Sequence, residues 1–410
     1  MSDAVSDEPD IRSLSFRLAM ALEEQFIDAG WPSGQLFSSE EELRRRYGIS
    51  RRAVSEAIRI LEIRGTARLR RGSSTGLEVA APDPDLVTET LRGYSYLNCV
   101  SEPHRVEALA LFESAQRRIA AFARPTGPAL ALNFLKNVLQ DRLTPGSPPL
   151  GKGMSRLRRN RAGRIALNLL DRYCHPAVGP GCKIGSEPAL SMQYNADRSI
   201  TRQAIRILES AALITSLPGR GNGIVTRRPG PGPAARLICN YLASQRLPHP
   251  AAFELFCAMS IEVIALAAHK ATEEDLQRFQ QIFAATWRAG RSAQMRDILL
   301  TENALFSAVK NPLIDLCIRS LRGYVAIAIA QSADVLPNEI ATCFARHTEQ
   351  VVEEIRCRRP EIAAAAHEHK LIAIRELQKQ HQPGVAQLLY GGLSPAAKGR
   401  LLEQERLHRT

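Results

Sequence analysis

The chain lacks the features that mark secreted, membrane-spanning or zinc-stabilised proteins. Its eight cysteines are scattered, and no two form a C-x-x-C pair, which argues against a zinc ribbon or a thioredoxin-like motif. The stretch MSDAVSDEPD at the start is acidic and has no apolar signal core, and no run approaches the ~20 apolar residues of a membrane span. We therefore expect a reduced, cytoplasmic protein without a membrane partner.

Motifs for catalysis are missing as well. The sequence has no nucleophile–base motif, no phosphate-binding loop and no complete set of metal ligands. The C-terminal half also lacks the alternating strand and helix pattern of an aminotransferase domain. We expect a protein that is not an enzyme and that has no certain cofactor.

Positive charge is what the chain has in excess. Lys and Arg number 54 against 42 Asp and Glu, which gives a net charge of +12 over 410 residues. The length predicts two or three domains, and 45% hydrophobic residues suffice for packed cores. The charge favours a polyanionic partner, nucleic acid first and a membrane surface second, over a merely basic soluble protein.

One hexapeptide, AIRILE, occurs at 57–62 and again at 204–209. The same offset of 147 residues, without a gap, pairs further identical residues: Gly34 with Gly181, Ser39 with Ser186, Leu43 with Leu190, Tyr47 with Tyr194, Arg51 with Arg198, Gly72 with Gly219, and Gly76 with Gly223. Apolar positions, a cap, an arginine and turn glycines recur together. We interpret the pattern as an internal duplication.

Each copy predicts the same local elements. In the first copy, apolar spacing predicts a helix over 14–30, Ser39 caps a short helix, and Ser50 caps a longer helix that ends at Gly65. Two short strands around a basic, glycine-rich turn follow over 66–80. The second copy repeats this order over 155–174, 186–194, 197–212 and 213–227. Helix, short helix, turn, helix and hairpin form the order of a winged helix-turn-helix.

The motif FSSEEEL…YGISRRAVSEAIRILEIRG…RRGSSTGLEV resembles the DNA-binding domain of GntR-family bacterial transcription regulators. The resemblance covers about 70 residues per copy and includes the capped short helix, the arginine-bearing helix and the glycine wing. The first copy departs at Ser55, where the family has an arginine, and at Ser74 in the wing. The second copy has Asp197 as its cap residue but keeps both arginines, Arg198 and Arg202.

The two longer helices are the candidate readers of double-stranded DNA, because a major groove accepts a helix whose first turns reach the base edges. Serines at helix starts favour phosphate, and wing glycines permit close approach to the DNA backbone. The candidate DNA-binding residues are Ser39, Arg51, Arg52, Arg71, Gly72, Ser186, Arg198, Ser199, Thr201, Arg202, Arg220 and Gly221. The charge run Arg44–Arg46 is treated as a solvated helix face.

Apolar helical periodicity continues over 237–395 and predicts an all-α bundle. The stretches AAHKATEEDL and ENALFSAVKNPLIDL resemble the FCD effector domain of the FadR branch of that family. The resemblance implies effector or metal positions at Asn303, Ser307, His347 and His369. Asn303 and Ser307 supply neutral oxygens where the family has a carboxylate and an imidazole, so we expect at best a weak site for a divalent cation. The alternative is that the two histidines line a cavity or are hydrogen-bonded within the bundle.

Composition changes divide the chain. The expected parts are winged domain one at 1–82, a helical segment at 83–143, a linker at 144–153, winged domain two at 154–229, a linker at 230–236, the helical domain at 237–395 and a charged tail at 396–410. Because 101–126 aligns with 246–272, the helical segment is interpreted either as a shortened copy of the effector bundle or as a simple amphipathic spacer.

The fold class expected is mainly α with small β wings: two winged helix-turn-helix domains and an FCD-like bundle. The function expected is a DNA-binding transcription regulator, such as a repressor, that responds to an unknown small-molecule effector and acts as a homodimer carrying four readers. One alternative is a metal- or small-molecule-binding protein or enzyme that uses Asn303, Ser307, His347, His367 and His369. Another is an interaction protein whose winged domains serve assembly.

Overall fold

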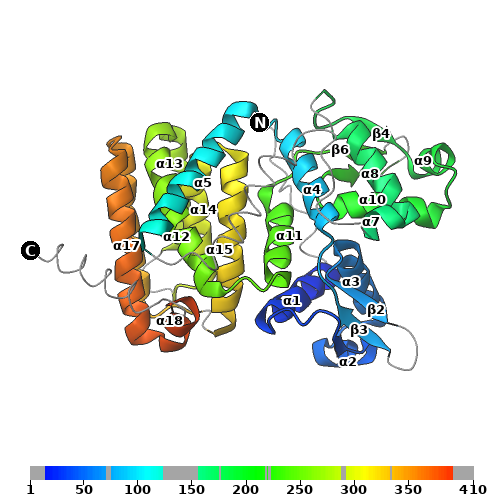
Figure 1. Ribbon diagram of the computed structural model, residues 1–410, viewed down its shortest axis with the longest axis horizontal. Helices are drawn as coiled ribbons and strands as arrows, with labels where there is room; N and C mark the ends of the chain where they lie inside the picture. The colour runs from blue at the N-terminus through cyan, green and yellow to red at the C-terminus, as the bar shows by residue number, and fades with distance from the viewer. Residues whose placement is uncertain are drawn as a thin grey trace, which may run out of the picture. The chain divides into compact units, whose positions relative to one another are not determined.

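The computed structural model describes residues 14–70, 75–122, 156–174, 177–217, 219, 223–287, 292–332 and 335–390. These residues are mainly helical, as predicted, with two small three-stranded sheets, each of which has one strand more than the predicted hairpin (Figure 1). The chain forms two compact units. Unit 1 takes the described parts of 1–101 and 137–246, and unit 2 takes those of 102–136 and 247–410.

Unit 1 begins with a module of three helices and one sheet. Its elements are α1 (Leu14–Asp28), β1 (Leu36–Ser38), α2 (Glu40–Tyr47), α3 (Arg51–Arg64), β2 (Ala67–Arg70) and β3 (Gly76–Val79). The sheet is antiparallel in the order β1-β3-β2. Leu22, Phe26, Leu43 and Leu61 are fully buried, so the apolar faces of the three helices share one core with the sheet. The order of the helices and of the hairpin β2–β3 is the one predicted, whereas β1, between α1 and α2, was not predicted.

The predicted helix ends of this module are confirmed. The Ser39 side chain accepts a hydrogen bond from the backbone of Glu42, whose carboxylate accepts one from the Ser39 backbone, which forms a capping box. Ser50 caps α3 through the Ala53 N–H. Gly65 ends α3 at a φ of 71°, in the left-handed region that favours glycine.

A second module in unit 1 follows the same order. Its elements are α7 (Arg156–Arg159), α8 (Arg161–Tyr173), β4 (Lys183–Gly185), α9 (Glu187–Gln193), α10 (Arg198–Ser210), β5 (Ile214–Ser216) and β6 (Ile224–Thr226), and the sheet order is β4-β6-β5. The single helix expected over 155–174 is wrong in detail, because Asn160 interrupts it and caps α8. Asparagine competes with the helix by offering its side chain to the Gly163 N–H.

Corresponding turns of the two modules make corresponding hydrogen bonds. The Gly34 N–H donates to the Val79 carbonyl at 2.8 Å, and the Gly181 N–H donates to the Thr226 carbonyl at 2.8 Å. Both glycines have positive φ, 83° and 86°. Each pair of counterparts lies 147 residues apart, so the offset seen in the sequence is also an offset in backbone geometry.

Two further helices complete unit 1, α4 (Pro84–Leu97) and α11 (Pro231–Ser244), and they pack against each other. The linker expected over 230–236 is therefore wrong, because α11 begins inside it with prolines in its first turn. Proline suits the start of a helix, where its missing N–H has no partner to lose. The segment expected over 83–143 is also divided, since α4 belongs to unit 1 and α5 (Glu102–Phe122) to unit 2.

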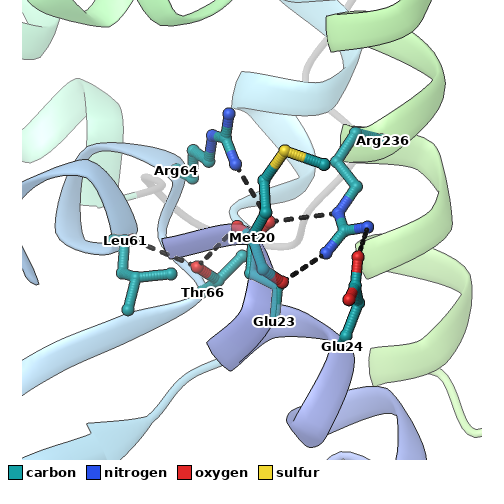
Figure 2. A network of polar contacts seen from close by, with 7 residues as sticks. All are labelled: Met20, Glu23, Glu24, Leu61, Arg64, Thr66 and Arg236. Atoms are coloured by element: carbon teal, nitrogen blue, oxygen red, sulfur yellow. Dashed lines mark hydrogen bonds and ion pairs between the residues drawn. The ribbon is translucent and has the colours of Figure 1, made fainter. Parts of the chain in front are cut away.

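A buried charge network joins α1, α3 and α11 (Figure 2). Glu23 is fully buried and accepts hydrogen bonds from Arg64 at 2.9 Å, from Arg236 at 3.1 Å and from Thr66 at 3.1 Å. Arg236 also pairs with Glu24 at 3.2 Å. Burial alone raises a carboxyl pKa, but the guanidinium groups of Arg64 and Arg236 outweigh it and lower the pKa of Glu23.

Unit 2 is a helical bundle, as predicted, with one isolated β-bridge between Gln294 and Val335. Besides α5, its helices are α12 (His249–Lys270), α13 (Glu273–Thr286), α14 (Met295–Ser307), α15 (Pro312–Ser332), α16 (Asn338–Arg356), α17 (Pro360–His381) and α18 (Pro383–Tyr390). Helix α12 packs against α5, α14, α15, α16, α17 and α18 and is the central helix (Figure 1).

Contrary to the expectation from the sequence, α12 is long and apolar enough to cross a membrane by length and composition. It is the one helix of this kind among the described residues, and 67% of its most apolar 18-residue window is buried inside the protein. Such a helix is weak evidence for a membrane, because the core helix of a bundle has the same properties. The packing of α12 accounts for its composition.

Candidate nucleic-acid interface

The first turn of α3 carries exposed arginines. Arg51 and Arg52 are both exposed, and the Arg51 side chain retains 81% of its accessible surface. Val54, Ala57 and Ile58 of the same helix are buried, so the helix has one face in the core and another toward solvent. Arg52 lies opposite this buried face, whereas Arg51 precedes Val54 by three residues and is exposed because it begins the helix.

The first turns of α10 have the same arrangement with one added constraint. Arg198 and Ser199 are exposed, as is Arg202. The Arg202 guanidinium donates to both carboxylate oxygens of Glu187 on α9, at 2.8 and 3.1 Å. These hydrogen bonds raise the pKa of Arg202 and hold its planar group in one orientation, although 55% of the side chain stays accessible.

Thr201 requires a correction. It was expected to contact DNA, but it is fully buried. Its hydroxyl donates to the Asp197 carbonyl at 3.2 Å and lies 3.1 Å from the Ser191 hydroxyl. Asp197 makes no side-chain cap, so Thr201 secures the start of α10.

The Glu187–Arg202 pair has a counterpart in the first module that the sequence comparison did not reveal. Glu40 and Ser55 lie 147 residues before these residues, and the Ser55 hydroxyl donates to Glu40 at 2.5 Å. Glu40 is also 3.9 Å from the Arg51 guanidinium. The acid at the first residue of each short helix is the signal that could have predicted this contact, since it faces the same position of the following helix in both modules.

The serines Ser39 and Ser186 lie at helix starts, as expected, and both side chains accept a hydrogen bond from their own helix. In α2 the N-terminal turn also holds Glu40, Glu41 and Glu42, and the hydrogen bond from the Ser39 backbone lowers the pKa of Glu42. Three carboxylates at this end compete with a phosphate for the helix dipole. The arginines, rather than Ser39, therefore define the candidate contact surface.

The wing glycines have a structural role that differs from the one expected. A Cβ at Gly223 would lie 2.5 Å from the Gly185 carbonyl oxygen, and one at Gly76 would lie 3.1 Å from the Ser38 carbonyl oxygen. These glycines let the central strand of each sheet approach its neighbour, and they do not require contact with DNA. The remaining wing candidates, Arg71, Gly72, Arg220 and Gly221, lie outside the described residues.

The two arginine-bearing helices contact each other within unit 1. Helix α3 packs against α10, and Arg206 of α10 forms an ion pair with Glu56 of α3 at 3.4 Å. Both side chains are about one third to two fifths accessible, 31% and 42%. The two arginine-bearing helices are therefore neighbours within unit 1, where the sequence predicts two separate readers.

The expected effector residues do not form an enclosed cluster. Ser307 is exposed and donates to the Ala304 carbonyl of its own helix at 2.9 Å, and His369 is exposed on α17. His347 is half-buried on α16 and lines a shallow groove of about 440 Å³. Burial, followed by the charges of Arg346, Lys370 and His369, lowers the pKa of His347. His347 is therefore neutral at pH 7.

Ionic side chains lie in the centre of the bundle instead. Glu302 on α14 pairs with Arg322 at 2.6 Å and with Lys370 at 3.4 Å, and all three are at most 5% exposed. The Lys370 ammonium also lies 4.6 Å from the centre of the Phe344 ring. His367 is fully buried beside this group, where its Nε2 lies 3.0 Å from the Ser260 hydroxyl and burial lowers its pKa well below the usual value.

The divalent cation implied by the FCD resemblance does not fit these residues. The Asn303 side-chain oxygen accepts a hydrogen bond from Arg322 at 3.5 Å, so a cation already faces this position. The Lys370 ammonium is close enough to lower the pKa of His347. Within the described part of the chain, no group of three or more His, Cys, Asp or Glu residues could hold a metal ion.

No protein-family model matches the chain, and no curated protein matches it. A solved structure named Streptococcus agalactiae GntR is similar to it, with 17% sequence identity and a TM-score of 0.39. The similarity covers 53% of this chain and 99% of that one. A likeness of this size says nothing of what this chain binds, and its own residues must answer that question.

Proposed function

We propose that the chain is a sequence-specific DNA-binding transcription regulator of the GntR type. One observation carries the proposal. Two modules with the same order of elements each present exposed arginines at the first turn of the corresponding helix, α3 or α10. An arginine-rich helix start of this kind suits a major groove of duplex DNA.

Arginine fits this role because its planar group can donate two hydrogen bonds to one guanine or one phosphate. Arg51 and Arg52 of α3 and Arg198 of α10 are the side chains that we assign to base edges and phosphates. Arg202 contributes through its oriented guanidinium, held by Glu187 with more than half of its surface accessible. The module cores hold the two helices that carry these side chains.

We further propose that the bundle of unit 2 responds to a small molecule and that the protein catalyses no reaction. The support is the FCD resemblance together with the groove that His347 lines with Asn338, Cys343 and Arg346. The bundle would respond without a bound metal, because the cations Arg322 and Lys370 occupy the surroundings of the expected ligands.

Selection of bound duplexes from fragmented DNA of the source genome tests the proposal. The purified chain should enrich a discrete set of fragments. Replacing Arg51 and Arg52 together by alanine, or Arg198 alone, should weaken binding to them by roughly 5- to 150-fold, the cost of about 1–3 kcal/mol per lost base contact. Arg278→Ala, at an exposed site on α13, is the charge-matched control and should leave binding unchanged.

Ionic strength provides the second measurement. Phosphate contacts release counterions, so the logarithm of the association constant should fall linearly with the logarithm of salt concentration. The slope should be smaller in the variants than in the unaltered chain or the Arg278 control. Failure to enrich any duplex at low salt, with the circular dichroism spectrum intact, would refute DNA binding.

A further inference from the structure

The recurrence of elements extends beyond the two modules. Five helices begin 147 residues before a counterpart: α1 before α8, α2 before α9, α3 before α10, α4 before α11, and α5 before α12. The turn after α4 has Cys99 at a φ of 53°, and the turn after α11 has Arg246 at a φ of 55°. A non-glycine residue with positive φ is uncommon. Two of them 147 residues apart are therefore independent evidence that the two halves of the chain correspond.

Contacts between the two copies are reciprocal. In unit 1, α1 of the first copy packs on α11 of the second, and α8 of the second copy packs on α4 of the first. Glu24 of α1 pairs with Arg236 of α11 at 3.2 Å. Asp171 of α8, the counterpart of Glu24, lies 3.8 Å from Arg92 of α4, which is three residues after Glu89, the counterpart of Arg236. A contact that occurs twice with the roles exchanged is the mark of a two-fold arrangement.

Other helices pack against their own counterparts. In unit 1, α3 contacts α10 and α4 contacts α11. In unit 2, α5 contacts α12, where Ser114 and Arg118 donate to Glu262 at 2.9 and 2.9–3.1 Å. In a two-fold arrangement, only a helix that lies next to the axis contacts its own counterpart. Each unit therefore contains the pairing that a homodimer would make from two chains.

We propose that one chain is a complete pair of DNA readers, in which α3 and α10 together bind one duplex at two adjoining half-sites without a second copy. The inference rests on the proposed function and replaces the expected homodimer with four readers. Residues 1–101 supply one reader and residues 156–246 the other, within the same compact unit. The partner is thus a single duplex of DNA for each chain.

The ion pair between the readers limits how far apart the half-sites can lie. With a rise of ~1.5 Å per residue and helix axes ~8–10 Å apart at contact, Arg51 and Arg198 lie at most about 30 Å from each other. The estimate takes Glu56 and Arg206 as the closest point, five and eight residues into their helices. One turn of duplex DNA measures ~34 Å, so the half-site centres fall within a single turn.

The two half-sites also differ in sequence. The second reader has the Arg202 guanidinium, held by Glu187, where the first has the Ser55 hydroxyl bonded to Glu40. An arginine prefers guanine, whereas a serine accepts several bases. The operator is therefore an asymmetric site in place of a palindrome.

Native mass spectrometry of the full-length chain with a selected duplex tests the inference. One chain per duplex, with a binding curve that shows no dependence on self-association, is the expected result. Two chains per duplex would overturn the single-chain pairing while leaving the proposed function in place. No complex with any duplex would refute the proposed function and this inference together.

A spacing experiment tests the same inference on the DNA. Five base pairs inserted between the two half-sites should weaken binding at least 10-fold, because the ion-paired readers cannot separate by half a turn. Arg51→Ala should relax base preference in one half-site and Arg198→Ala in the other, as read by selection with each variant. Undiminished binding across the insertion, or the same positions relaxed by both variants, would overturn the pairing.

Discussion

Replacing Glu23 by glutamine should destabilise unit 1 strongly. Glutamine keeps the shape of the side chain but removes the charge that two buried guanidinium groups share, Arg64 at 2.9 Å and Arg236 at 3.1 Å. Their side chains are only 8% and 12% accessible, so water cannot replace the lost carboxylate. Removal of one partner from a buried ion pair costs about 3–5 kcal/mol in the free energy of unfolding. For a unit of this size, that corresponds to a fall in Tm of roughly 6–20 °C.

Tryptophan fluorescence can follow this unit separately. The sequence has two tryptophans, and Trp31 is buried in the first module, where its indole N–H donates to the Ala80 carbonyl at 3.0 Å. In a Trp287→Phe background, emission from Trp31 reports the unfolding of unit 1 in urea. Adding Glu23→Gln to this background should lower the urea midpoint with little change in the slope of the transition.

Glu24→Gln is the matched control, because Glu24 is the next residue on the same helix. Its side chain is 34% accessible and makes one ion pair, with Arg236 at 3.2 Å. Because Glu24 is partly exposed to solvent and Arg236 keeps its pair with Glu23, the loss of this ion pair should cost about 0–1 kcal/mol. A cost for Glu23→Gln no greater than that for Glu24→Gln would refute the reasoning, since burial would then not decide the strength of the network.

The pH dependence gives the same prediction a second measurement. Arg64 and Arg236 lower the pKa of Glu23 below 4.5, against the opposing effect of burial. A carboxyl with a lowered pKa in the folded state stabilises the protein fully above its unfolded pKa. That stabilisation is lost as the pH falls through the folded pKa. The unaltered chain should therefore lose stability of unit 1 below about pH 4.5, and the Glu23→Gln variant should show a shallower loss there.

Three further changes have defined outcomes. Glu56→Arg should weaken DNA binding, because it places like charges between α3 and α10, and adding Arg206→Glu should restore binding. Fluorescence anisotropy on a selected duplex measures both variants. Weak binding by the double variant as well would show that the ion pair does not align the readers. Gly223→Ala should cost about 1–3 kcal/mol, measured by thermal circular dichroism, because its Cβ meets the backbone of β4 at 2.5 Å. Glu302→Gln should lower the free energy of unfolding of unit 2 by about 3–5 kcal/mol, because it leaves Arg322 and Lys370 buried without an anion. Urea unfolding followed by Trp287 fluorescence measures the change, and an unchanged urea midpoint would contradict the prediction.

Sequence patterns predicted the parts of the fold that depend on neighbouring residues. Caps at Ser39 and Ser50 and the stop at Gly65 need only a few adjacent residues, and the structure has them at these positions. The repeat gave two sequences for each helix and hairpin, which is why two modules with the same order of helices could be predicted, although the first strand of each sheet was not. Helical periodicity identified the bundle of unit 2 in the same way.

Features decided by tertiary packing were predicted less well. The proline-rich stretch at 230–236 suits a linker and a helix start equally, and only its burial against α4 selects the helix α11. Thr201 lies on the buried side of α10, two positions from exposed Ser199, and composition does not distinguish the two. The ions Glu23 and Arg236 lie 213 residues apart, so no local pattern links them.

Under the proposed single-chain pairing, the contact between α3 and α10 also determines how occupancy of a DNA site depends on protein concentration. Readers joined by one backbone are present at a fixed and high effective concentration, with no prior encounter between molecules. Occupancy of a site then rises with the first power of protein level, where an assembling dimer would follow a steeper law. In a single chain, the contacting surface of α3 has to fit only α10 and not a second copy of itself. Glu56 can therefore pair with Arg206, while the corresponding residues Gln203 and Arg59 evolve under separate constraints.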